Sequence, residues 1–151
     1  MVSREQRQKW KSSVTSLLSD PFGLQSFRDF LEKRKEESKI QVTINCVDFY
    51  EKCEHHKKLT KMDELKKSAK AIFDVYLDEL AEKEIPAVGE SKNSSKKIAE
   101  KLSKGELSIK ELKKIFDDAQ ENVCQFITDG GYHKAFCKEL KIGRKTTCTI
   151  Y

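Results

Sequence analysis

Hydrophobic residues at helical spacing limit what this chain can fold into more than any other feature of its sequence. Near the start, four apolar residues follow the spacing i, i+4, i+7 and i+8: Trp10, Val14, Leu17 and Leu18. Side chains at this spacing share one face of a helix, so a helix is predicted up to about Ser19. Charged residues make up 36% of the 151 residues and hydrophobic residues 37%. This balance favours amphipathic helices over a β-sandwich or barrel, and the length is typical of one domain.

Capping residues and helix breakers predict several further helices. Asp20-Pro21 has the form of an N-cap followed by a proline in the first turn. The apolar face of the helix that follows is formed by Leu24, Phe27, Phe30 and Leu31. A capping box at Ser108 and Glu111 begins a later helix, which Gly130-Gly131 ends. The last helix is predicted to stop at Gly143.

A long helix is predicted between the capping signal at Thr60 and the turn residues Pro86 and Gly89. Its apolar face is formed by Leu65, Ala69, Ile72, Phe73, Tyr76, Leu77 and Leu80. Residues 91–95 have the composition of a loop, and a short helix after them is expected to end near Gly105.

One segment, from Ile40 to Phe49, has a local pattern that favours a strand. Ile40, Val42, Ile44 and Cys46 alternate with polar residues, and β-branched residues are frequent. Both features are typical of β-strands. On local pattern alone, this is the one plausible strand of the chain.

The charge pattern does not favour a nucleic-acid partner. The net charge of +5 comes from 30 basic residues against 25 acidic ones, and the two signs alternate along most of the chain. A nucleic-acid-binding domain of this size usually gathers Lys and Arg on one stripe or carries a recognisable motif. Neither is found, so the charged residues are interpreted as a solvated surface.

The cysteines and histidines do not indicate a metal or catalytic site. The five cysteines are widely spaced: Cys46, Cys53, Cys124, Cys137 and Cys148. Cys53, His55 and His56 lack a second pair of metal ligands, and His133 beside Cys137 is expected to be a surface histidine. No apolar stretch has the length of a membrane span or signal peptide, so a cytoplasmic protein with reduced thiols and no cofactor is expected.

Four stretches of the chain, in order and at matching spacing, resemble the regulator of G-protein signalling (RGS) family over roughly residues 10–142. They are Trp10 with Leu17-Leu18 and Gly23-Leu24 through Phe27-Arg-Asp-Phe-Leu31, then Cys46-Val-Asp-Phe49, then Ala69 to Tyr76, and Phe116-Asp-Asp-Ala-Gln120 with Tyr132 beyond it. One such stretch would be a weak signal, whereas their order and spacing together are specific.

The resemblance implies an all-α, RGS-like fold of about nine helices in a single domain over residues 1–142. The fold would comprise a terminal lobe and an antiparallel four-helix bundle. It implies that segment 40–50 is helical and buries Ile40, Ile44, Val47 and one face of Phe49. Members of the family bind the α subunit of a heterotrimeric G protein and hold its switch segments in the shape of the transition state for GTP hydrolysis. A monomer that has no catalytic site of its own is therefore expected.

The resemblance also indicates which residues contact the α subunit, and this chain departs from the family at several of them. The family's Glu-Asn pair falls on Ser38 and Lys39. Its contact aspartate falls on Gly130, and its arginine falls on Lys134. An asparagine amide donates and accepts hydrogen bonds, whereas Lys39 only donates.

Three further contact candidates follow from the same resemblance. Phe126 matches a position that presents an apolar contact, and Asp129 lies one residue before the expected carboxylate. Asn93 is the asparagine available in the loop expected from Gly89 to Ile98. The stretch from Lys97 to Lys114 is longer than in short family members, and in this it resembles axin-type homologues.

The last nine residues, 143–151, are expected to form a flexible basic tail. Cys148-Thr-Ile-Tyr151 has the C-a-a-X form of a prenylation signal, with Arg144 and Lys145 just upstream, although tyrosine is not a usual final residue. Lipidation of Cys148 would bring the protein to the cytoplasmic side of the plasma membrane.

The leading hypothesis is that the protein accelerates GTP hydrolysis by a G-protein α subunit, with an activity weakened by these departures. The alternative is a scaffold that keeps the RGS fold for protein contacts without GTPase activation. The two hypotheses differ in whether Lys39, Gly130 and Lys134 sustain contacts with the switch segments.

Overall fold

The computed structural model describes residues 3–37, 39–78, 80–85 and 91–149, and the regular structure in these ranges is helical throughout. In order, the described residues form α1 (Arg4–Ser12), α2 (Val14–Ser19), α3 (Pro21–Glu32), α4 (Ile40–Lys57), α5 (Met62–Ile72), the π-helical segment η1 (Phe73–Leu77), α6 (Ser91–Lys104), α7 (Ile109–Lys114), α8 (Asp117–Asp129) and α9 (Tyr132–Thr149). The prediction of an all-α fold is confirmed.

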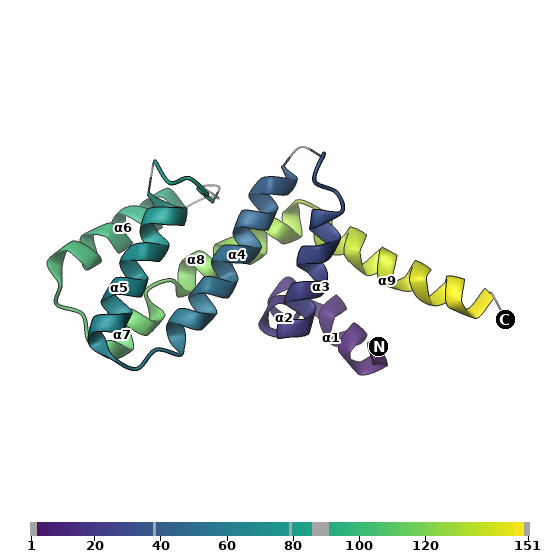
Figure 1. The fold of residues 1–151 in the computed structure, drawn as a ribbon, viewed down its shortest axis with the longest axis horizontal. Helices are drawn as coiled ribbons and strands as arrows, with labels where there is room; N and C mark the ends of the chain where they lie inside the picture. The colour runs from purple at the N-terminus through teal and green to yellow at the C-terminus, as the bar shows by residue number, and fades with distance from the viewer. Residues whose placement is uncertain (1–2, 38, 79, 86–90, 150–151) are drawn as a thin grey trace.

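The helices form two groups (Figure 1). One group contains α1, α2, α3 and the start of α9, so the first helices of the chain pack against the beginning of the last one. The other is a bundle in which α4, α5, α6 and α8 each pack against two neighbours in that cyclic order, with α7 against α5. This is the expected arrangement of a terminal lobe and a four-helix bundle.

Segment 40–50 is helical, because it forms the first half of α4. Ile40, Ile44 and Val47 follow helical spacing and are buried, as is Phe49. The prediction from the family resemblance is confirmed. The strand-like local pattern is overridden because β-branched side chains at this spacing also form one helical face that packs into the bundle core.

Side-chain contacts along α4 define an antiparallel bundle. His56 hydrogen-bonds Ser68 of α5, and further back along α4 the ring of Phe49 packs on Tyr76 at a centroid distance of 5.6 Å. Because the partners advance along α5 and η1 as the contacts move back along α4, the helices are antiparallel. Against α8, Lys57 pairs with Asp117 at 3.1 Å.

A second contact between α4 and α8 also shows that these two helices are antiparallel. Gln120 donates from Nε2 to the carbonyl of Tyr50 and to Glu54, both at 3.3 Å. Moving forward along α8 therefore moves back along α4. Both helices rise by about 1.5 Å per residue, so the same pairing can be extended along them. It brings the carboxyl end of α8 beside the first turn of α4.

The terminal lobe depends on a close approach of α3 to α1 and α2. The Trp10 indole donates from Nε1 to Asp20 Oδ2 at 2.9 Å, and Asp20 Oδ1 accepts from the amide of Phe22 at the start of α3. The hydrogen bond from Trp10 lowers the pKa of Asp20. At Gly23, a Cβ would lie 2.4 Å from the Leu17 carbonyl oxygen, so a glycine is needed there.

A cluster of aromatic rings attaches α9 to this lobe. Phe136 contacts the rings of Trp10, Phe27 and Phe30 at centroid distances of 5.4 to 6.3 Å. His133 also joins the cluster, since its Nε2 donates to the Trp10 carbonyl at 2.7 Å. The expectation of a surface histidine is therefore wrong: His133 is half-buried, and this nitrogen cannot accept the Cys137 proton while it donates to Trp10.

Several helix boundaries differ from those predicted. The helix predicted up to Ser19 is divided at Ser13 into α1 and α2, and the helix predicted from Ser108 is divided after Lys114 into α7 and α8. The long helix changes to a π-helical turn at Phe73 and ends at Leu77, so Leu80 is 93% exposed and does not belong to its apolar face. Helix α6 already begins at Ser91, where a loop was expected. Helix α9 continues past Gly143 to Thr149, because a single glycine weakens a helix without ending it.

Buried polar groups in the bundle are held by specific partners. His56 is 1% exposed; its Nε2 donates to the Leu112 carbonyl at 2.7 Å, and its Nδ1 accepts from the Ser68 hydroxyl. Burial lowers the pKa of His56, and the hydrogen bond to Leu112 partly opposes this. Both ring nitrogens are thus engaged within the core. None of the described helices has the length and apolar character needed to cross a membrane.

We predict that Gly23→Ala destabilises the protein by about 2–3 kcal/mol, because the new methyl group would overlap the Leu17 carbonyl and the Trp10 indole. The measurement is urea-induced unfolding. Gly130→Ala is the control, since its Cβ would meet no atom closer than 3.4 Å. Equal stability of the Gly23 variant and the wild type would contradict the close approach of these helices.

We predict that the stability of the protein decreases as the pH falls below about 6.5, the ordinary pKa of histidine. The folded state binds a proton at His56 less readily than the unfolded state, so its stabilising contribution is complete above the unfolded pKa. That contribution is lost as the pH falls toward the folded pKa. His56→Gln should flatten the dependence of the melting temperature on pH, whereas the exposed neighbour His55→Gln should not. Parallel curves for His56→Gln and the wild type would contradict this assignment.

Candidate functional site

Three segments that are distant in sequence lie at the same end of the bundle. They are the start of α4, residues 80–85 after η1, and the junction between α8 and α9. The antiparallel register brings the first and third together. The second is folded back on η1 by hydrogen bonds from the Ile85 amide to the Tyr76 carbonyl and from the Lys83 amide to the Val75 carbonyl. Figure 1 shows the start of α4 and the segment after η1 along the same edge of the molecule.

The backbone of Lys39 is the most unusual feature at this end. With φ 71° and ψ −5°, it is the one non-glycine residue among those described that has a positive φ. Its carbonyl accepts hydrogen bonds from the amide and the hydroxyl of Thr43, and its exposed side chain makes no cap for α4. Asparagine tolerates this left-handed conformation better than lysine, so the family's residue suits this backbone better than the residue present.

The α8–α9 junction carries four of the predicted contact residues. Phe126 is half-buried and packs against the core, whereas the carboxylate of Asp129 is exposed and accepts from Gln125 at 2.8 Å. Gly130 ends α8 in a right-handed conformation, with room for a side chain. Lys134 is exposed in the first turn of α9.

The connection between α3 and α4 is attached to α9 close to this end. The guanidinium of Arg34 lies 3.8 Å from the centroid of the Phe30 ring, and it also pairs with Glu139 of α9. Such stacking and pairing restrain an otherwise polar connection. Arg34 therefore fixes the chain just before Lys39 relative to the helix that carries Lys134.

Three of the residues predicted to act in binding or lipidation have side chains outside the described part of the structure. Ser38 lies outside the described residues, and so do the side chains of Asn93 and Cys148. The backbone of Asn93 belongs to the first turn of α6 and not to a loop. The roles predicted for these three residues stay predictions.

Leu80 is the residue at this end that sequence reasoning missed. It is 93% exposed and lies in the segment after η1. Its spacing from Ile72 and Tyr76 follows the helical period, so periodicity assigns it to the core. Its exposure follows from the π-helical turn, in which the Asp78 amide bonds the Phe73 carbonyl and the helix stops.

Comparison with known protein families identifies the family of this chain. The model of the Regulator of G protein signaling domain matches residues 13–140. The chain belongs to the RGS family. The matched region includes the start of α4, the segment after η1 and the α8–α9 junction.

Individual relatives agree with this assignment. Regulator of G-protein signaling 10 of Mus musculus is 33% identical over 92 residues, which cover 61% of this chain and 47% of the relative. Regulator of G-protein signaling 18 of Rattus norvegicus is 29% identical over 139 residues, or 92% of this chain and 52% of the relative. The RGS chain thus spans about half the length of the curated relatives it matches.

We predict that Lys39→Gly stabilises this RGS domain by about 0.5–1 kcal/mol, because glycine adopts a positive φ without the steric cost that lysine has. Urea-induced unfolding measures the change. Lys33→Gly is the matched control, since Lys33 has a right-handed backbone at the end of α3 and should gain nothing. A gain in the control as large as that at Lys39 would contradict the explanation.

Proposed function

We propose that this RGS domain binds the α subunit of a heterotrimeric G protein and accelerates its GTP hydrolysis, with a weakened activity. The observation that carries this proposal is that three chain segments lie at the same end of the bundle. Two of these segments contain Lys39, Gly130 and Lys134, the positions onto which the family's contact residues fall.

The mechanism needs no catalytic residue from the RGS domain. An α subunit already holds GTP, magnesium and an arginine, and its slow step is to arrange a glutamine and a water molecule against the transferring phosphoryl group. A rigid surface that binds the mobile switch segments in this arrangement lowers the barrier by preorganisation. The bundle end suits this role, because buried packing of α4 against α5 and α8 holds the contact segments in place.

Two residues at this surface weaken the proposed contacts. Lys39 offers a charged donor on a flexible stem where the family has an amide, and Gly130 offers no side chain where the family has a carboxylate. Each lost hydrogen bond to a charged or preorganised partner costs about 1.5–3 kcal/mol. Together the two losses would slow the reaction by about a hundredfold or more.

Other residues at the same end still offer contacts. Lys134 is exposed and keeps a positive charge where the family has an arginine. Leu80 adds an exposed apolar side chain, and part of Phe126 is accessible to solvent. These contacts support residual binding, and therefore weak activation instead of none.

We predict that the double variant Lys39→Asn with Gly130→Asp activates GTP hydrolysis about a hundredfold more than the wild type, because it restores both lost hydrogen bonds. Both substitutions are compatible with the backbone, since asparagine tolerates the conformation at Lys39 and the site of Gly130 has space for a Cβ. The measurement is a single-turnover GTPase assay with an inhibitory-class α subunit.

The control makes the same change in net charge at the opposite end of α4. Lys58→Asn with Thr60→Asp alters two exposed residues in the connection to α5 and should leave the rate unchanged. If the wild type and the Lys39/Gly130 variant are both inactive, and neither binds any α subunit in its transition-state form, the proposal is wrong. The scaffold hypothesis would then replace it.

A further inference from the structure

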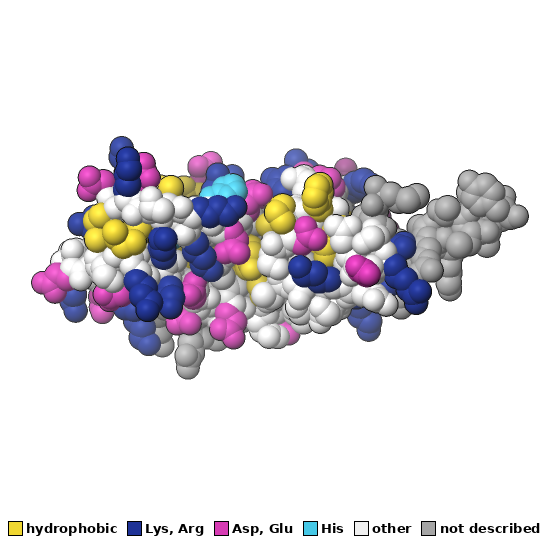
Figure 2. Space-filling view, turned by 90° about the horizontal axis from the view of Figure 1, so that it is seen from below, with side chains coloured by type: hydrophobic (Ala, Val, Ile, Leu, Met, Phe, Trp, Pro, Cys, Tyr) yellow, Lys and Arg dark blue, Asp and Glu magenta, His cyan; other side chains and the backbone are white. Residues whose placement is uncertain are grey.

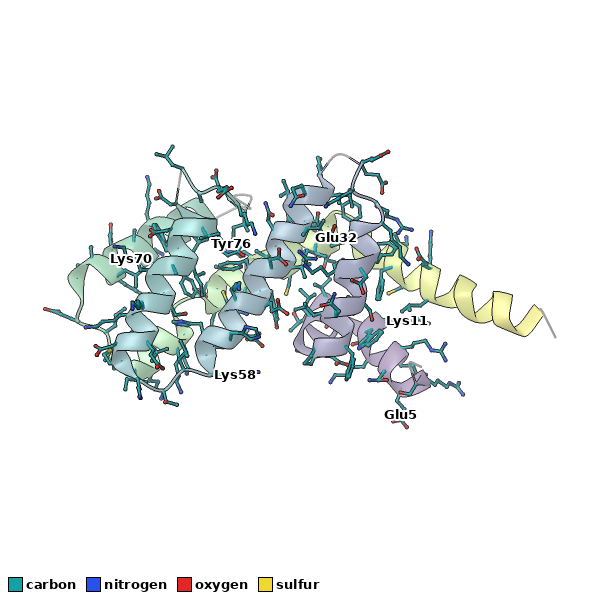
Figure 3. All side chains as sticks on the ribbon, viewed as in Figure 1. Glu5, Lys11, Glu32, Lys58, Lys70 and Tyr76 are labelled. Carbon is teal, nitrogen blue, oxygen red and sulfur yellow. The ribbon has the colours of Figure 1, made fainter. Side chains whose placement is uncertain are left out.

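A pocket lies on the bundle away from the end that carries Lys39, Gly130 and Lys134. Helices α5 and α6, the first turn of η1, the connection after α6, and α7 line this pocket of about 460 Å³. This volume falls within the range of about 300–1,000 Å³ that is common for pockets that bind small molecules. Lys70, which lines the pocket, lies on the side of the bundle remote from α3 (Figure 3).

The walls of the pocket are mainly apolar. Phe73, Leu102 and Leu107 are partly buried and pack against the core, and Leu112 is 1% exposed. Gly105, with φ +67°, turns the chain after α6 so that Leu107 can line the pocket. In Figure 2, hydrophobic side chains are exposed at the end of the molecule formed by α5, α6 and α7.

The polar part of the lining is predominantly basic. Lys66, Lys70 and Lys101 are exposed, and Asp74 is the single carboxylate among the described residues that line the pocket. None of these three lysines forms an ion pair with another described residue. Three ammonium groups beside an apolar cavity favour a ligand that is apolar in its body and negatively charged at one end.

We propose that this pocket binds an anionic amphiphile: a single acyl chain that ends in a carboxylate or a phosphate. The acyl chain would replace water against Phe73, Leu102 and Leu107, which is favourable because it removes apolar surface from solvent. The anionic group would remain at the mouth, within reach of Lys66, Lys70 and Lys101. Neutral and cationic amphiphiles of the same length would lack this second interaction.

Isothermal titration calorimetry with the full chain tests the proposal. Dodecanoate and dodecyl phosphate are titrated as monomers, below the concentration at which they form micelles, and each should bind saturably at one site. Dodecanol and dodecyltrimethylammonium should bind at least about tenfold more weakly, because they lack the charge that the lysines attract. The absence of saturable binding by both anions would overturn the proposal, and so would equal binding by all four compounds.

Variants locate the site. Lys66→Glu with Lys70→Glu should weaken anion binding by at least about tenfold, because it replaces two attractions by two repulsions. The matched control, Lys9→Glu with Lys52→Glu, changes the same charge at exposed residues outside the pocket lining. It should leave the affinity unchanged.

A third variant separates pocket binding from attraction to the charged surface. Ala99→Phe places an aromatic ring in the pocket wall and should abolish binding without removing any charge. Thermal unfolding confirms that each variant is folded. Leu107→Ser, which removes apolar wall without filling the pocket, replaces Ala99→Phe if that variant is unstable, and it should weaken binding by about tenfold. Binding that survives in the folded wall variant would overturn the proposal.

Discussion

The packing of Phe49 between two other aromatic rings is the contact on which the arrangement of the bundle depends. Its ring lies 5.6 Å from that of Tyr76 and 6.1 Å from that of Phe116, and its side chain is fully buried. These contacts join α4 to η1 and to the residue that precedes α8. In an antiparallel bundle, the alignment of two helices at one point fixes which of their residues lie side by side elsewhere. The contacts at Phe49 therefore also determine which residues lie together at the end of the bundle that carries Lys39 and Gly130.

The terminal lobe restrains the same end from the other side. Phe136 joins α9 to α1 and α3 through aromatic contacts, and Arg34 joins the connection before α4 to α9. Arg28 adds a link between α3 and α4 through two hydrogen bonds to Asp48. The candidate contact surface is therefore held by both groups of helices. A rigid surface of this kind is what stabilisation of mobile switch segments would require.

Most of the fold could be predicted from the sequence because apolar spacing and capping residues are local signals. The segment that begins at Ile40 needed the resemblance to the family, since its local pattern is equally that of a strand. Leu80 could not be assigned from spacing, because the π-helical turn interrupts the helix without a breaking residue in the sequence. Neither the left-handed backbone of Lys39 nor the hydrogen bond from His133 to Trp10 has a signal in the sequence. Both depend on contacts between distant segments.

The central claim is that the start of α4, the segment after η1 and the α8–α9 junction form one surface for a G-protein α subunit. It is tested most directly by nuclear magnetic resonance of the isotope-labelled chain during titration with an inhibitory-class α subunit in its transition-state form. The account predicts that the amide signals of Lys39, Leu80, Gly130 and Lys134 shift or broaden together. Changes confined to the opposite end of the bundle, or no change at saturating concentrations of the α subunit, would contradict it.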